Sequence, residues 1–353
     1  MSRASRALGL DRRRRRLPPG LAGAALSGGG REAAPRRLRV SAVTVPGTPW
    51  HALWERFGER ARRALPRHVP RLRTRGELGG EEQAIAQLRR GRIELAGLSL
   101  QGAATLVPEL NLILAPFQFE DPAVADALLD GPLFAPFAER FGAKGLALLQ
   151  WAEVGHTHLY ARRPLRRPEA LRGIRMRASN ALGARLFGRA LGMNQVPVSF
   201  GEVLTALETG LIEGGQSGTG LYALAGLVRH APHLSLTAHA YDAGVVVANL
   251  RWWEALAEDE RAAVRSCLDS PESHRREVRA FVAELEAGGR ERRGGVVHRR
   301  TAAERAAWRE AARPVAGLRS PPSARPRGRS RRGYRPSSES PPEGRLPPFV
   351  RTK

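Results

Sequence analysis

Residues 173–217 alternate between two hydrophobic periodicities, and this alternation limits the folds that the chain can adopt. Apolar and basic side chains alternate over residues 173–178, as they do along a half-buried strand. Apolar residues then recur at helical spacing from Leu182 to Leu191. A short apolar strand at 196–198, a second helix and a third strand follow. The segment therefore predicts an α/β fold in which strands and helices alternate.

Polar residues stand where the two helices of this segment should begin. Ser179 and Asn180 can each cap the first helix with a side-chain oxygen. Ser199 and Glu202 have the spacing of a capping box, in which the two side chains satisfy free backbone N–H groups at the helix start. Pro197 has no N–H group to donate, so its strand should lie at a sheet edge or end there.

Arg177 and Phe200 each lie at a corner between a strand and the following helix. In open α/β sheets, ligands collect at the carboxyl ends of the strands. The planar guanidinium of an Arg at such a corner can form two parallel hydrogen bonds to a carboxylate. The alternative interpretation is that Arg177 is a surface strand residue that pairs with a local Glu.

Four sequence segments occur in the order of one known family's motifs. They are PEALRGIRMR at 168–177, LG at 191–192, VPVSFGEVLTALETG at 196–210 and IEGGQS at 212–217. Together they resemble the substrate-binding proteins of tripartite ATP-independent periplasmic (TRAP) transporters, a family that takes up C4-dicarboxylates, sialic acid and other organic acids. The resemblance extends over residues 38–315.

The resemblance implies an α/β fold of two lobes that close on a ligand like a clamp, as in periplasmic binding proteins, with mixed sheets, hinge crossovers and a long backing helix. The composition of the two chain ends differs from that of the lobes. The expected divisions are a basic leader at 1–37 that resembles a degenerate signal peptide, a first lobe at 38–154 with 243–282, a second lobe with backing helices at 155–242 with 283–313, and a disordered Arg-, Pro- and Ser-rich tail at 314–353.

The resemblance also implies a carboxylate-binding site between the lobes. Arg177 would hold the ligand carboxylate, and Phe200 would pack on the ligand's carbon skeleton. Ser217 takes the position of the family's ligand-contacting Asn, and its hydroxyl can still donate to a carboxylate. Many family members carry a further Arg where this chain has Thr157 and His158, so a grip by two Arg side chains is not expected here.

Two further candidate residues have both a binding and a structural interpretation. Glu81 sits where the family often places a site carboxylate, but an acid at a helix start also offsets the helix dipole. Trp50 follows the first strand and could either stack on a ligand or cover the hydrophobic core.

The function implied by the resemblance is capture of a small organic acid with one carboxylate, followed by its delivery to TRAP membrane permease subunits. We expect a periplasmic monomer and not an enzyme, because no nucleophile motif, phosphate-binding loop or metal-ligand spacing is recognisable. No catalytic residue, cofactor or metal is therefore assigned. The single Cys267 excludes an internal disulfide and a multi-cysteine zinc site, and it should be a small buried residue of a helix.

The net charge of +24 raises a different possibility, binding to nucleic acid or to a membrane surface. Residues 1–39 carry +9 and residues 314–353 carry +8, which leaves +7 for the rest of the chain. The excess thus lies mainly in the two ends, and we expect no nucleic-acid partner. A basic protein that binds through these ends, and a ligand-sensing subunit that uses the same clamp, remain the alternative functions.

Several further elements can be assigned from periodicity alone. Residues 52–65 should form an amphipathic helix with Leu53, Phe57 and Ala61 inward. The apolar run at 108–119 predicts a strand, and 258–290 predicts one long amphipathic helix. The remaining assignments are strands at 38–45, 72–74, 146–151, 234–241 and from 245, a crossing between lobes over 151–158, and a last helix at 301–312 anchored by Trp308.

Overall fold

The computed structural model describes residues 36–179, 181–289 and 294–315. Within these ranges the named strands form one nine-stranded sheet in the order β2-β1-β3-β8-β4-β7-β5-β6, with β9 beside β8. The strands are β1 (Arg36–Ser41), β2 (His68–Arg73), β3 (Leu95–Ser99), β4 (Leu146–Ala161), β5 (Arg175–Ala178), β6 (Asn194–Pro197), β7 (Gly214–Gly218), β8 (His233–Asn249) and β9 (Val296–His298).

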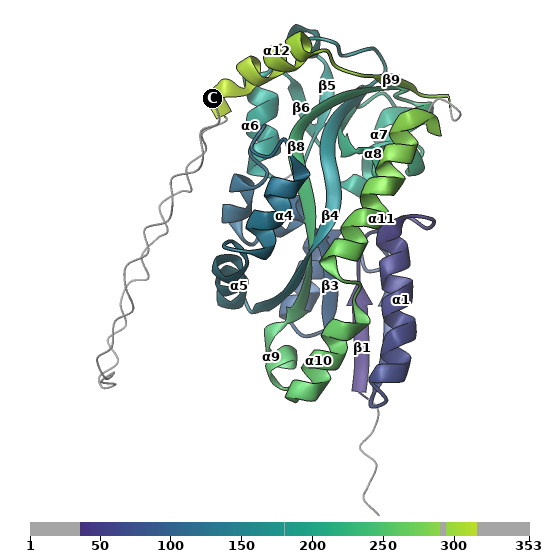
Figure 1. Ribbon diagram of the computed structural model, residues 1–353. Coiled ribbons are helices and arrows are strands. Elements are labelled where there is room, and N and C mark those ends of the chain that lie inside the picture. Colours follow the sequence, from purple (N-terminus) through teal and green to yellow (C-terminus); the bar gives the residue numbers. More distant parts are fainter. Residues whose placement is uncertain (1–35, 180, 290–293, 316–353) are drawn as a thin grey trace, which may run out of the picture.

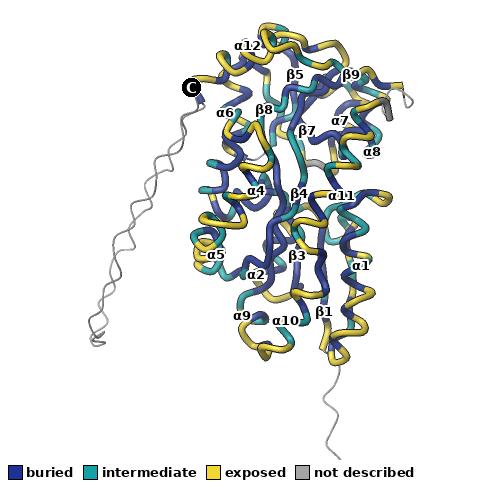
Figure 2. The backbone as a smooth tube through the Cα atoms, viewed as in Figure 1, coloured by how far each residue is buried: buried dark blue, intermediate teal, exposed yellow. Residues whose placement is uncertain are grey.

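Helices cover both faces of this sheet (Figure 1). Their outward faces are exposed, whereas the central strands are buried (Figure 2). The α-helices are α1 (Pro49–Ala64), α2 (Glu81–Arg89), α3 (Leu100–Ala103), α4 (Pro122–Asp130), α5 (Phe134–Ala143), α6 (Leu182–Ala190), α7 (Val203–Glu208), α8 (Thr219–Leu224), α9 (Leu250–Glu254), α10 (Glu258–Cys267), α11 (Pro271–Glu284) and α12 (Ala302–Ala312). Short helical turns are η1 (Pro108–Leu112), η2 (Pro168–Leu171), η3 (Phe200–Glu202), η4 (Leu227–Arg229), η5 (Leu285–Gly289) and η7 (Arg313–Val315).

Two long strands join the two ends of the molecule. β4 has 16 residues and β8 has 17, and they pair antiparallel from Leu146 opposite Asn249 to Ala161 opposite His233. Leu148 and Val247 pack in a core at one end, whereas Leu159 and Leu234 pack in cores at the other. The expected crossing between lobes is therefore part of β4, and the mixed sheets of the two lobes are one continuous sheet.

Four clusters of buried side chains fill the two ends. Two of them flank the sheet around β1, β3, α1–α5, α9 and α10, which we call the first lobe. The other two flank it around β5–β7, β9, α6–α8 and α12, which we call the second lobe. α11 contacts α1, β4 and α8, so this helix packs on both lobes. The residue limits predicted for the lobes stay a prediction.

Several local predictions are confirmed. Leu53, Phe57 and Ala61 of α1 are buried, and Pro197 lies in β6, the last strand of the sheet order. Cys267 is buried at the end of α10. Thr301 and Glu304 form the capping box of α12, and Trp308 of this helix is completely buried in a core cluster with Leu165, Leu171 and Phe187.

The predicted strand over residues 108–119 is wrong. Pro108 begins the helical turn η1, and Phe117 has a φ of 57°, which lies outside the extended backbone region of a regular strand. Leu110 and Phe119 are nevertheless buried in the first-lobe core. The apolar run therefore reflects burial and not strand pairing, a distinction that periodicity alone does not make.

The predicted single helix over 258–290 is also wrong, because the chain breaks between α10 and α11. Pro271 has no N–H group and disfavours helical backbone in the residue before it. Ser270 accordingly has a ψ of 145° and caps α11 by accepting a hydrogen bond from Ser273 N–H. α11 then ends in the π-helical turn η5.

The expected cap of α6 is a third correction. Its N-cap is Ala181, and the hydroxyl of Ser179 is buried without a partner. Asn111, which is 72 residues away, accepts a hydrogen bond from Gly183 N–H at 3.0 Å and so satisfies this helix start. Asn180 lies outside the described residues. At η3, Glu202 accepts hydrogen bonds from the N–H and hydroxyl of Ser199, which is half of the predicted capping box.

Candidate ligand-binding site between the lobes

Arg177 leaves β5 on the face opposite the buried Met176. Its side chain is half-buried, and its Nε donates to the carbonyl oxygen of Val198 at 3.0 Å. Gly215 of β7 lies beside it, and a Cβ there would be 3.1 Å from the Cβ of Arg177. Burial lowers the pKa of Arg177, and the nearby Tyr160 and Glu81 oppose this shift. The guanidinium is therefore held in a confined position at the carboxyl end of its strand.

Glu81 is the first residue of α2, in the first lobe. Its carboxylate accepts hydrogen bonds from the N–H and the hydroxyl of Ser99, at 2.5 and 2.7 Å, where β3 turns into α3. Gly102 makes this approach possible, because a Cβ there would overlap the carboxylate. Burial raises the pKa of Glu81, whereas Ser99 and the charge of Arg177 lower it. Glu81 thus braces the β3–α3 corner, and its charge interacts with that of Arg177 in the second lobe.

Ser217 and His158 lie opposite each other on β7 and β4. The Ser217 hydroxyl donates to the carbonyl oxygen of Gly218 at 3.1 Å. The Nδ1 of His158 accepts a hydrogen bond from Ala238 N–H, and its Nε2 lies 3.5 Å from a carboxylate oxygen of Glu286. Both side chains are buried and face the same side of the sheet, since directly opposed residues share a face.

Trp50 ties the first lobe to the second. Its Nε1 donates to the carbonyl oxygen of Glu153 on β4 at 2.7 Å, and its ring meets Phe281 of α11 edge-on at 6.0 Å. A Cβ on Gly220, in α8, would lie 2.5 Å from the Trp50 ring. Trp50 thus packs between α1, β4, α8 and α11, and its contact with a ligand stays a prediction. The side chain of Phe200 lies outside the described residues.

Asp242 was not singled out from the sequence, although it is the one acid of an otherwise apolar stretch at 240–249. It lies on β8 and is 5% exposed. Its Oδ2 accepts a hydrogen bond from Nε2 of Gln101 at 3.0 Å, whereas its Oδ1 has no hydrogen-bond partner within the described part of the chain. Burial raises the pKa of Asp242 to about 7, and the charges of Glu81 and Glu153 add to this shift.

A small cavity of about 20 Å³ lies between the lobes. Gln101 and Leu114 line it from the first lobe, and Thr157, Phe187 and Gln216 line it on the second-lobe side. Its volume suits a single water molecule. The hydroxyl of Thr157 has no partner in the structure and could bind such a water.

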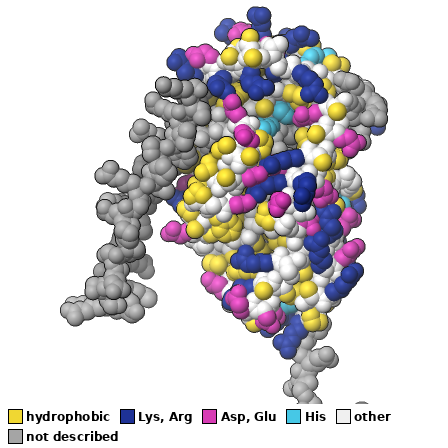
Figure 3. Space-filling view, in the orientation of Figure 1, with side chains coloured by type: hydrophobic (Ala, Val, Ile, Leu, Met, Phe, Trp, Pro, Cys, Tyr) yellow, Lys and Arg dark blue, Asp and Glu magenta, His cyan; other side chains and the backbone are white. Residues whose placement is uncertain are grey.

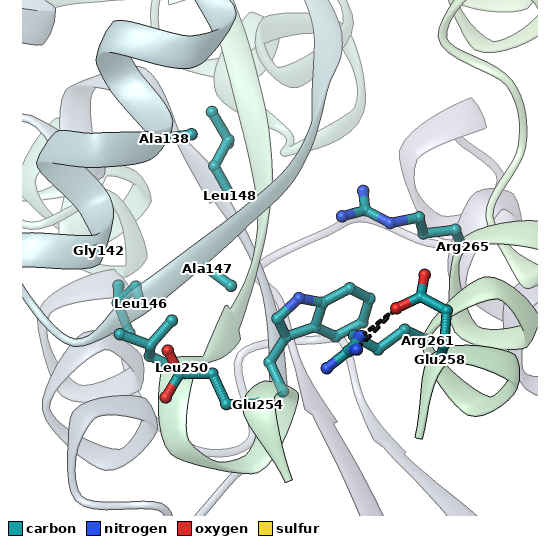
Figure 4. Close-up of a pocket in the computed structure, with 11 residues that line it drawn as sticks. Ala138, Gly142, Leu146, Ala147, Leu148, Leu250, Glu254, Glu258, Arg261 and Arg265 are labelled. Carbon is teal, nitrogen blue, oxygen red and sulfur yellow. Dashed lines mark hydrogen bonds and ion pairs between the residues drawn. The ribbon is translucent and has the colours of Figure 1, made fainter. Parts of the chain in front are cut away.

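A larger cavity, of about 400 Å³, lies at the far end of the first lobe (Figure 4). α5, β4, α9 and α10 line it, with Arg261 paired to Glu258 at 2.6 Å on its rim. The guanidinium of Arg265 lies 4.9 Å from the centre of the Trp253 ring. The lining residues include none of the six residues predicted from the sequence, so volume alone does not mark the candidate site.

One group of three described residues has the geometry of a metal site. Ligand atoms of Asp269, His274 and Glu277 lie within 4.8 Å of one another. Arg56 already bridges the two carboxylates, at 2.6 Å from Asp269 and 2.7 Å from Glu277. The group is therefore an ion-pair network that joins α1, the turn between α10 and α11, and α11.

Comparison with known families decides how this architecture is classified. The profile of the family described as "Bacterial extracellular solute-binding protein, family 7" (DctP) matches residues 40–317. The chain belongs to this family. The TRAP resemblance is thereby confirmed. Family 7 proteins bind solutes and are not enzymes.

Two curated family 7 relatives illustrate the range of similarity. A solute-binding protein of Verminephrobacter eiseniae is 30% identical over 204 residues, which cover 57% of this chain and 61% of that protein. The C4-dicarboxylate-binding periplasmic protein DctP of Rhodobacter capsulatus is 25% identical over 300 residues, which cover 80% of this chain and 86% of that protein. The chain thus spans less than two thirds of the first relative's length.

A solved family 7 structure shows the same two-lobe fold. The sugar acid binding protein DctPAm of Advenella mimigardefordensis, in complex with galactonate, is 26% identical. The match has a TM-score of 0.75 and covers 80% of this chain and 92% of that chain. The expected α/β clamp architecture is therefore confirmed. Among the described residues, no helix is both long and apolar enough to cross a membrane.

Proposed function

We propose that this protein is the periplasmic solute-binding protein of a TRAP transporter and that it holds a small organic acid between its lobes through a salt bridge to Arg177. The observation that carries the proposal is the position of Arg177 at the carboxyl end of β5, half-buried and subject to the charge of Glu81 in the other lobe. A guanidinium that is already partly removed from water binds a carboxylate more strongly than an exposed one does.

The ligand would enter between open lobes and be enclosed when they close. Phe200 would pack on its carbon skeleton, and Ser217, Glu81 and His158 would line the same site. Trp50 would hold the lobes together from the side of α1. The closed, loaded protein would then deliver the ligand to the membrane permease subunits, as a monomer.

One relative is named for its binding of C4-dicarboxylates, and the solved structure of another protein of similar fold contains galactonate. Both similarities support an acidic ligand. With Thr157 and His158 in place of a second Arg, we propose a ligand that presents one carboxylate to the protein. Each lobe then contributes to recognition, with the charge supplied by the second lobe.

The alternative of binding through the basic ends concerns residues 1–39 and 314–353, of which only 36–39 and 314–315 lie within the described ranges. Basic and acidic side chains intermingle on the face of the described part shown in Figure 3. This distribution favours ligand capture over binding to a polyanion. Removal of both ends should therefore leave ligand binding unchanged. A sensing role would use the same clamp and the same Arg177.

The test is a thermal-shift screen of the protein against small carboxylates, with Arg177→Ala measured in parallel. A ligand at 100 times its dissociation constant should stabilise the protein by about 2.7 kcal/mol. This corresponds to a rise of several degrees in the melting temperature. We expect Arg177→Ala to abolish the shift, because the ligand charge then has no partner.

Arg175→Ala is the matched control, since Arg175 lies on the same strand but is exposed and pairs with Glu213. It should keep the full shift. If Arg177→Ala responds to the same acids as the original protein, the proposed salt bridge is wrong. If no carboxylate shifts the original protein, the proposed function is wrong.

A further inference from the structure

Asp242 is a buried acid in which Oδ2 accepts a hydrogen bond and Oδ1 accepts none from the residues that the structure describes. It lies near the middle of β8, where the long strands pass from one lobe to the other. Gln101 donates to Oδ2, and the backbone N–H of Ala243 lowers the pKa of the carboxyl group. Among the described residues, no donor lies in hydrogen-bonding geometry to Oδ1, although an ionised carboxylate can accept several hydrogen bonds. A buried acceptor without a donor is costly, so such a group in a binding protein indicates a partner that is supplied by the ligand.

The neighbourhood of Asp242 has room for that partner. Gly155 of β4 is its register partner, and a Cβ at Gly155 would meet no atom within 4 Å. The charged groups that influence Asp242 are Glu81 of α2 and Glu153 of β4, and both are acids. Glu153 is itself paired with Arg279 at 2.6 Å. The electrostatic surroundings of Asp242 are therefore predominantly acidic.

We propose that Asp242, positioned by Gln101, is a specificity-determining residue that selects acids carrying a hydrogen-bond donor on the carbon chain and discriminates against a second carboxylate. This inference rests on the proposed function, in which Arg177 holds the first carboxylate. A hydroxyl or ammonium group of the ligand donates to Oδ1 of Asp242. A second carboxylate would instead meet two acids, Glu81 and Asp242, without a further guanidinium to balance it.

The ionisation of Asp242 makes the discrimination against a second carboxylate depend on pH. Because burial raises its pKa to about 7, Asp242 is mainly protonated at pH 6 and mainly ionised at pH 8. Repulsion of a second carboxylate therefore increases from pH 6 to pH 8, and so does the strength of the bond from a donor. The ratio of the affinity for a donor-bearing acid to the affinity for a dicarboxylate should therefore rise as Asp242 ionises.

Isothermal titration calorimetry of the full chain with three four-carbon acids tests the inference. D-erythronate carries hydroxyl groups, L-threonine carries an ammonium and a hydroxyl group, and succinate carries a second carboxylate. We expect the donor-bearing acids to bind more tightly than succinate, with a preference that grows roughly tenfold between pH 6 and pH 8. The two donor-bearing acids distinguish a hydroxyl from an ammonium partner.

Asp242→Asn removes the charge but keeps the shape, so it should reduce the preference at pH 8 by roughly tenfold and make it independent of pH. Comparison with this variant also separates the effect of Asp242 from any change in the ionisation of the ligands between pH 6 and pH 8. Gln101→Met, which frees Asp242 from its anchor, should weaken the preference in the same direction. Asp259→Asn is the matched control, because Asp259 is exposed on α10, and it should change nothing.

The outcomes separate this inference from the proposed function. If Asp242→Asn leaves the ratio and its pH dependence unchanged while Arg177→Ala abolishes binding, the role of Asp242 is wrong and the Arg177 clamp stands. Tighter binding of succinate than of both other acids to the original protein at pH 8 also overturns the role of Asp242. If no acid binds the original protein, the proposed function fails and this inference fails with it.

Discussion

His274 is an imidazole in surroundings that favour its neutral form. It is 1% exposed on α11, and neither ring nitrogen has a hydrogen-bond partner among the residues that the structure describes. Burial lowers the pKa of His274 to about 4, and Arg56 adds to this shift, whereas the charges of Asp269 and Glu277 oppose it. The side chain therefore acts as a packing residue of α11 at neutral pH.

We predict that His274 makes the protein sensitive to acid. Between the usual pKa of about 6.5 and the value of about 4, the unfolded chain binds a proton that the folded protein does not. The stability contributed by neutral His274 is thus present above pH 6.5 and is lost as the pH falls towards 4, by up to roughly 3 kcal/mol. His274→Leu should lose less unfolding free energy over this window in urea titrations. If the unfolding free energies of the two proteins fall in parallel as the pH is lowered, the lowered pKa of His274 is contradicted.

The strand β7 depends on two glycines where it passes β4. A Cβ at Gly214 would overlap the carbonyl oxygen of Tyr160 and lie 2.9 Å from the Cα of Ala161. Gly215 makes room in the same way for the Tyr160 ring and for Arg177. The close contact of β7 with β4 therefore sets the position of the strand that carries Ser217.

We predict that Gly214→Ala destabilises the protein by about 1–3 kcal/mol, because the added methyl group meets backbone atoms that have little freedom to move. The measurement is the midpoint of urea unfolding. Gly142→Ala is the control, because Gly142 lies in α5 with no atom within 4 Å of its Cβ position. That change should stabilise by about 0.5–1 kcal/mol, since Ala favours helical backbone. If Gly214→Ala leaves the midpoint of urea unfolding unchanged, β7 can move away from β4 to accommodate the methyl group.

The two lobes share both their sheet and their backing helix. β4 and β8 pass through both ends, and ion pairs of Arg279 with Asp126 and Glu153 join α11 to α4 and β4. Unfolding one lobe would leave half of each long strand without its packing. The connection between the lobes is therefore too extensive for them to behave as independent domains.

We predict a single cooperative unfolding transition. Phe57→Ala in the first lobe and Trp308→Ala in the second should each remove about 3–5 kcal/mol, since both side chains are completely buried. Each change should shift the same transition when it is followed by circular dichroism and by calorimetry. Two separated transitions, each sensitive to only one of the variants, would show that the lobes unfold separately.

Local patterns predicted those parts of the protein in which neighbours along the chain determine the structure. The periodicities of α1, α12 and the strand–helix segment around Arg177 come from residues three or four positions apart on a helix and two apart on a strand. The ordered motifs at 168–217 placed Arg177 at the end of its strand and indicated the family. Those features need no knowledge of the rest of the chain.

Contacts between distant segments depended on packing, and the sequence carried no local signal for them. Asn111 satisfies the start of α6 across 72 residues, and Ser99 engages Glu81 across 18. The apolar run at 108–119 was buried without becoming a strand. Burial raises the pKa of Asp242, and the charges of Glu81 in α2 and Glu153 in β4 add to this shift. Burial and the charge of neighbours are properties of the folded chain, so only its three-dimensional arrangement could determine them.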